Sequence, residues 1–191
     1  MLGQLPKTLN VCGVDYRIKT DFRNILQIIS AFNDSELQDR EKAYICLKRM
    51  YEDFDSIPTE RYEEAYTAAA EFIDGPSSND RPGPKTVDWE KDEHLIFAAV
   101  NKVTGVELRA LDYLHWWSFL GFFLSIDHDG LIGSIISIRH KRAKGKKLEK
   151  HETEFFNANR SLCEIHGNKN RKKDAEDYLE ALYKELTNGE G

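Results

Sequence analysis

The sequence predicts a mainly α-helical protein in which an N-terminal β-hairpin precedes a bundle of about seven helices. Two observations indicate this class. Apolar and polar residues alternate only within the first twenty residues, whereas from residue 22 onward apolar residues recur every three or four positions, as on a helix face. Glycine, proline and capping-type residues separate the successive helical stretches.

The hairpin is predicted from two short alternating runs joined at 12–13. Gly13 supplies the positive φ that a two-residue turn requires. A lone hairpin is only marginally stable in water, so we expect its apolar face to rest on the helices. The apolar positions of the two strands are Leu9, Val11, Val14, Tyr16 and Ile18.

Three amphipathic helices are predicted next. The first covers 22–32, and the second covers 37–51 after the capping-type residues at 33–35. The third covers 62–73 and follows Pro58, a residue suited to a first helical turn.

The clearest break in the chain is the segment 75–86, which holds three of the five prolines. We expect a mobile linker or a long surface loop there. The break divides the chain into residues 1–74, with the hairpin and helices, and a helical region at 87–191, although one continuous domain is the alternative.

The second half is predicted to be helical throughout. Gly105 is a natural C-cap for the first of these helices. In the last helix, Ala175, Tyr178, Leu179 and Leu182 fall on one face together with Leu186. The predicted helices cover 89–103, 111–126, 131–144, 148–165 and 174–186.

The segment 112–126 is the most apolar part of the chain. It is too short for a membrane span of about 20 apolar residues and contains Asp112 and His115. The chain also begins without the basic start and apolar core of a signal peptide. We therefore expect a soluble protein that makes no membrane contact.

The aromatic residues of this segment predict a core helix or a partner-binding helix. Neighbouring residues of a helix point about 100° apart, so the two adjacent tryptophans cannot share one direction. We expect part of this surface to contact another helix, in this chain or in another. The candidate residues are Trp116, Trp117, Phe119, Phe122 and Phe123.

A basic block at 139–150 stands out in a chain whose net charge is −6. It could bind nucleic-acid phosphates without recognising the bases. Alternatively, its cations could interact favourably with the C-terminus of the helix they end. A third possibility is that they pair with an acidic surface of another subunit. Of these three alternatives, nucleic-acid binding is the least favoured. The candidate residues are Arg139, Lys141, Arg142, Lys144, Lys146 and Lys147.

No catalytic, metal or cofactor motif is present. The six histidines form no His-Glu-x-x-His, and the three cysteines are widely spaced. A calcium loop around Gly130 fails because Ile136 would occupy the position of the bidentate Glu. We expect a non-enzymatic protein of a reducing cytoplasm, without cofactors.

Four elements together resemble the bacteriophage gene-product-fifteen family of tailed phages and prophages of Gram-positive bacteria. The most specific is LHWWSFL at 114–120. The resemblance is strongest from 88 to 165 and looser over the N-terminal hairpin and helices. The other three elements are WEKDEHLIFAAV at 89–100, GVEL at 105–108, and ISIR at 136–139 with the lysine-rich residues after it.

The resemblance implies a role in tail assembly in the host cytoplasm. Proteins of this family are regarded as chaperones that keep the tape-measure protein soluble until tail-tube subunits polymerise around it. Contacts with the tail-tube protein and self-association would fit the same role. The alternatives are a minor tail protein retained in the virion and a small nucleic-acid-associated protein. The family names no catalytic residues.

Overall fold

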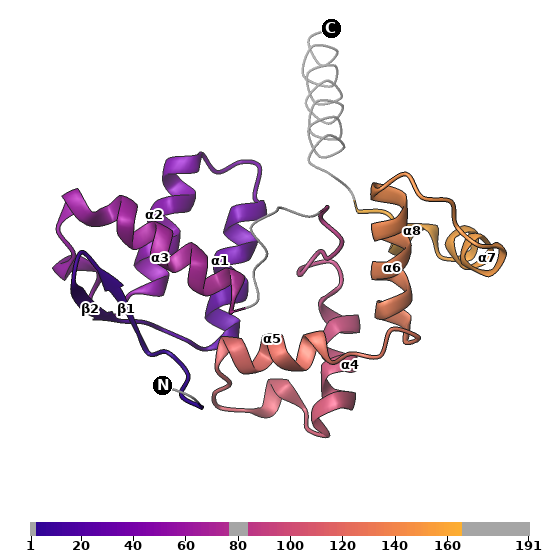
Figure 1. Cartoon of the computed structure of the whole chain (residues 1–191), viewed down its shortest axis with the longest axis horizontal. Coiled ribbons are helices and arrows are strands. Elements are labelled where there is room, and N and C mark those ends of the chain that lie inside the picture. The colour runs from indigo at the N-terminus through magenta and orange to yellow at the C-terminus, as the bar shows by residue number, and fades with distance from the viewer. Residues whose placement is uncertain (1–2, 77–83, 166–191) are drawn as a thin grey trace, which may run out of the picture.

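The computed structural model describes residues 3–76 and 84–165. Within them a two-stranded hairpin precedes eight α-helices and three short 3-10 helices, so the predicted fold class is confirmed. The hairpin and helices α1–α3 lie at one end, α4 and α5 in the middle, and α6–α8 at the other end (Figure 1). The predicted helix at 174–186 lies outside the described residues, as does most of the predicted linker.

The hairpin pairs β1 (Thr8–Val11) with β2 (Val14–Arg17) in antiparallel register. Cys12 and Gly13 form the turn with φ values of 48° and 81°, the left-handed geometry of a two-residue hairpin. As expected, the hairpin rests on a helix: β1 packs against α3, and Val11 is fully buried.

Helices α1–α3 follow the predicted pattern closely. Helix α1 (Phe22–Asn33) begins at Asp21, whose side chain accepts from the backbone of Arg23. Helix α2 (Asp39–Met50) begins two residues later than predicted, because Gln38 and Glu41 form a capping box there. Helix α3 (Tyr62–Asp74) ends at Gly75. Two 3-10 turns, η1 (Phe54–Ser56) and η2 (Thr59–Arg61), connect α2 and α3.

Helix α4 (Glu93–Thr104) ends at Gly105 as predicted but begins four residues later than Trp89. The side chains of Asp88 and Asp92 accept from nearby backbone N–H groups and hold residues 88–92 as a turn. Another 3-10 turn, η3 (Leu108–Ala110), follows.

Helix α5 (Trp116–Leu124) is shorter than the predicted 111–126, and that prediction is wrong at its start. His115 is extended and forms a bridge with Asp21. Its Nδ1 accepts from the backbone of Trp117, so it caps the helix, and its Nε2 lies 2.9 Å from the carbonyl of Pro6.

The last described helices are α6 (Leu131–Ala143), α7 (Lys150–Ala158) and α8 (Arg160–Cys163). One helix was predicted over 148–165, but Asn159 leaves helical geometry and separates α7 from α8. Among the described residues, no helix is both long and apolar enough to cross a membrane.

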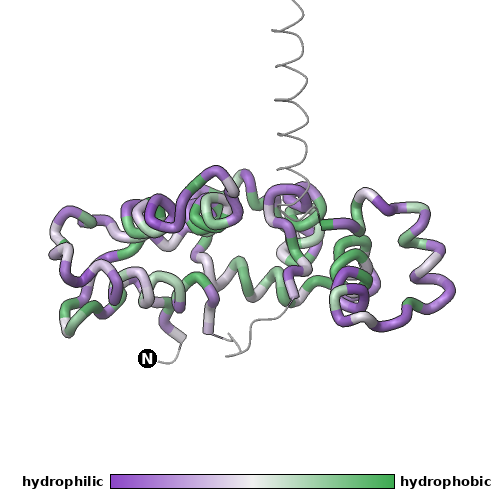
Figure 2. Tube along the Cα trace, turned by 90° about the horizontal axis from the view of Figure 1, so that it is seen from above, coloured by the Kyte–Doolittle hydropathy of each residue, from purple (hydrophilic) through white to green (hydrophobic). Residues whose placement is uncertain are grey.

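The core joins the two halves of the chain. The Phe22 ring of α1 stacks on Phe119 of α5 with centroids 4.7 Å apart, and Phe97 of α4 lies 5.8 Å from Phe22. Hydrophobic residues run along α5 in the middle of the molecule (Figure 2). A smaller cluster of Ile135, Ile138 and Cys163 holds α6 and α8 together.

The two tryptophans of α5 both contact the end of α3. Trp116 is buried, and its indole N–H donates to the carbonyl of Ile73 at 2.8 Å. Trp117 is half-buried, and its indole donates to the carbonyl of Phe72 at 2.9 Å. Carbonyls in the last turn of a helix lack partners within the helix, so the indoles satisfy them.

We predict that Trp116→Phe lowers the free energy of unfolding by about 1–3 kcal/mol, because it leaves the buried Ile73 carbonyl without a donor. Trp117→Phe should cost about 1 kcal/mol or less, since water can reach the half-buried site. Urea unfolding followed by circular dichroism measures both. Equal losses would contradict this account of α5.

A second prediction concerns the exposed thiol of Cys12. It donates to a Glu64 carboxylate oxygen 2.7 Å away, and this hydrogen bond raises the pKa of the thiol. Glu64→Gln removes the charge, so the thiolate should form at lower pH and iodoacetamide should alkylate Cys12 several-fold faster at pH 8. Mass spectrometry follows the rate. Glu63→Gln is the control, and an unchanged rate for Glu64→Gln would contradict the assignment.

Candidate partner-binding groove

The aromatic candidates of α5 divide into two groups in the structure. Trp116 and Phe119 are 1% and 0% exposed, so they lie in the core and offer no surface to a partner in this fold. Trp117, Phe122 and Phe123 are half-buried and pack against the core. Of the five candidates, Trp116 and Phe119 therefore take the core alternative in this fold, and only Trp117, Phe122 and Phe123 keep exposed surface.

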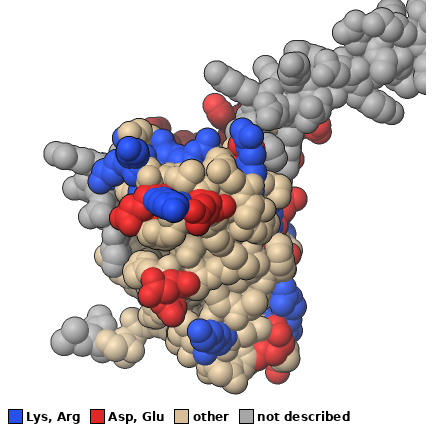
Figure 3. Space-filling view, turned by 90° about the vertical axis from the view of Figure 1, so that its right-hand side faces the viewer, with Lys and Arg blue, Asp and Glu red and all other residues tan. Residues whose placement is uncertain are grey.

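The basic block also divides. Arg139 is 4% exposed and belongs to the interior, which corrects its placement in the predicted surface. Lys141 pairs with Glu152 at 2.6 Å, and Arg142 lies over the ring of Phe156. Lys144, Lys146 and Lys147 are exposed. Basic side chains gather at one edge of the α6–α8 end, with acidic side chains beside them (Figure 3).

A groove of about 730 Å³ lies between α1 and the segment that leads into α4. No local sequence pattern predicts this groove, because its two walls are more than fifty residues apart in the chain. Positions 23, 26, 27, 30 and 33 of α1 recur at helical spacing and form one wall. The apolar lining consists of Leu26, Phe32, Trp89, Phe97 and Ile165.

Charged residues line the rims of the groove. Asp88, Glu90 and Glu93 belong to the wall beside α4. Arg109 lies 3.5 Å from Glu93, and its guanidinium lies 4.4 Å from the centre of the Phe97 ring. At the other end, Lys85 donates to the side-chain oxygen of Asn33 at 2.9 Å and bridges the two walls.

Aromatic residues of α5 pack against the apolar lining of the groove. Trp89 packs on Trp116, Phe119 and Phe123, with ring centroids 6.0, 6.0 and 4.9 Å apart. Phe97 lies 6.2 Å from Phe119. The predicted aromatic cluster therefore positions groove residues rather than lining the groove itself.

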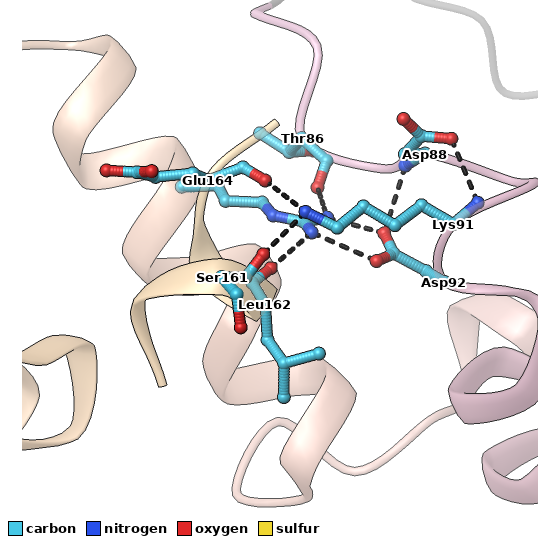
Figure 4. Close-up of polar contacts among 8 residues, drawn as sticks. Thr86, Asp88, Lys91, Asp92, Ser161, Leu162 and Glu164 are labelled. Atoms are coloured by element: carbon cyan, nitrogen blue, oxygen red, sulfur yellow. Dashed lines mark hydrogen bonds and ion pairs between the residues drawn. The ribbon is translucent and has the colours of Figure 1, made fainter. Parts of the chain in front are cut away.

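A buried ion pair fixes the second wall to the α6–α8 end. The guanidinium of Arg139 donates to both carboxylate oxygens of Asp92, one of them at 2.9 Å, and to the carbonyls of Thr86 and Leu162. Figure 4 shows how these groups converge from the turn before α4 and from α8. Among the described residues, Nε of Arg139 is the one buried side-chain polar atom without a partner.

Lys91 makes a second connection between the same segments. Its ammonium donates to the carbonyls of Ser161 and Glu164 at 2.5 and 2.6 Å (Figure 4). Ile165, the next residue after Glu164, lines the groove. The ion pair and Lys91 therefore hold the end of α8 against the groove.

The groove suits noncovalent binding of an apolar segment. Its volume falls within the range of ligand sites, and it combines an apolar lining with a few charged groups. Over 3–76 and 84–165, no three His, Cys, Asp or Glu side chains come together as a metal site would require.

A family model for the Bacteriophage Gp15 protein matches residues 1–164. This match identifies a phage structural or assembly-related protein. The chain belongs to the Bacteriophage Gp15 family, which confirms the resemblance seen in the sequence and extends it through the N-terminal hairpin and helices. No curated protein and no solved structure matches the chain.

We predict that Asp92→Ala lowers the free energy of unfolding by about 3–5 kcal/mol, because it leaves the buried Arg139 charge unpaired. Asp55→Ala, which removes the exposed Lys48–Asp55 pair, should cost within about 1 kcal/mol. Chemical denaturation measures both variants. Similar small losses would show that the buried pair does not hold the groove wall.

Proposed function

We propose that this protein is a tail-assembly chaperone that binds a helix of the phage tape-measure protein in the groove. The observation that carries the proposal is the apolar lining of an open groove in a member of a phage family. Binding would keep the tape measure soluble until tail-tube subunits replace the chaperone. The mechanism is noncovalent holding without catalysis, in the host cytoplasm.

The dimensions of the groove support a helical ligand. The α1 wall runs from Arg23 to Asn33, a rise of about 15 Å at 1.5 Å per residue. Apolar anchors seven residues apart on a bound helix are separated by about 10.5 Å, so two such anchors fit along this wall. Helix-in-groove binding uses this spacing of anchors.

The mixed charges at the rims favour a defined orientation of that helix. The acidic wall at Asp88, Glu90 and Glu93 prefers basic residues on the ligand, whereas Arg109 prefers acidic ones. Exposed lysines at 144, 146 and 147 would steer an acidic partner toward the molecule or, in the alternative function, contact nucleic acid.

The test is co-expression with the tape-measure protein of the same phage. We expect the tape measure to become soluble and to co-purify. Leu26→Glu should reduce the co-purified amount at least tenfold, because it places an unpaired charge in the apolar lining. The matched control is Leu124→Glu, since Leu124 is 69% exposed and lies outside the groove lining.

Circular dichroism and thermal unfolding would establish that both variants are folded. A tape measure that stays insoluble with the wild-type protein would contradict the chaperone function and leave the nucleic-acid and virion-component alternatives. Equal co-purification by wild type and a folded Leu26→Glu variant would contradict the groove as the binding site.

A further inference from the structure

We propose that the C-terminal residues of this chain bind in the groove of the free protein and that a partner helix must displace them. The occupant is the apolar face of residues 174–186. Because the segment would regulate access to the partner site, the inference rests on the proposed function. The binding of the segment itself can be measured without any partner.

The described chain ends inside the proposed binding site. Ile165 lines the groove, and contacts from Lys91 and Arg139 to the preceding residues fix its position. The remaining 26 residues, 166–191, therefore start from the groove itself. A tethered segment of this kind has an effective concentration of about millimolar, so an intrinsic Kd below about millimolar is enough to keep the site mostly occupied.

The length of the connection allows the segment to reach every part of the groove. Eight residues, 166–173, separate Ile165 from the segment 174–186. Fully extended, they span up to roughly 26–29 Å, which exceeds the wall of about 15 Å that α1 provides. The segment can therefore lie along α1 without strain in the connection.

The apolar pattern of the segment matches the groove lining. Ala175, Tyr178, Leu179, Leu182 and Leu186 follow the spacing of one helix face. Tyr178 and Leu182 lie one helical turn apart, as do Leu182 and Leu186. The length of the α1 wall accommodates about two such intervals of 6 Å. The groove offers Leu26, Phe32 and Trp89 to these side chains, among other apolar groups.

The segment and the groove both carry charges of each sign. In the segment, basic residues come first, at 169 and 171–173, and acidic residues follow at 174, 176, 177 and 180. The groove lining includes acidic residues at 88, 90 and 93 and basic residues at 23, 85 and 109. Each kind of charge on the segment therefore has groups of the opposite sign available in the groove.

Hydrogen exchange on the full-length protein without any partner tests the inference. We expect the amides of 174–186 to exchange at least tenfold more slowly in the wild type than in Leu182→Asp. The matched control is Lys184→Asp, which introduces the same acid on the opposite face of the predicted helix and should retain the protection.

Two groove variants leave the segment itself unchanged. Leu26→Glu and Ser30→Glu should each remove the protection of 174–186 by placing an acid against the acidic segment. Ser30 is exposed, so its variant reports on the groove even if Leu26→Glu fails to fold. Protection that persists in a folded groove variant would overturn the proposal.

Two further hydrogen-exchange results would also overturn the proposal. Rapid exchange of 174–186 in the wild type would show that the segment does not bind. Protection that rises with protein concentration would assign the occupant to a second copy and overturn binding within one chain. Because no tape-measure protein is present, these results are independent of the chaperone function.

Discussion

The pairing of two helix N-termini organises this fold. The backbone N–H of Phe22 donates to the carbonyl of Leu114, and that of Trp116 donates to the carbonyl of Thr20, at 3.0 and 2.8 Å. These bonds place α1 and α5 so that Phe22 stacks on Phe119 across the two halves of the chain. Every wall of the groove depends on this arrangement, because α1 forms one side and α5 supports the other.

Much of the fold could be predicted because local rules act on neighbouring residues. The hairpin turn at Cys12 and Gly13 and the end of α4 at Gly105 followed from sequence alone. Long-range contacts changed the other boundaries. The apolar helix starts at Trp116 rather than at residue 111, because His115 is extended and pairs with Asp21, a residue 94 positions away in the chain.

The candidate site was predicted less well for the same reason. Trp116 and Phe119 were expected to contact either a core or a partner, and periodicity cannot separate these on a helix that is apolar on most sides. Arg139 was predicted to be a surface cation. The residues around it in the basic block do not indicate that it pairs with Asp92, 47 residues earlier in the chain. The groove is lined by residues between 23 and 165, and a local sequence pattern cannot predict contacts between residues so far apart in the chain.

This spread of groove residues along the chain has a consequence for the timing of synthesis. Translation proceeds from the N-terminus, so α1 emerges early, while Ile165 is among the last groove residues to leave the ribosome. A nascent or truncated chain that lacks α8 has an incomplete site. Completion of the groove is therefore coupled to synthesis of the chain as far as residue 165, and a shorter nascent chain lacks part of the groove lining.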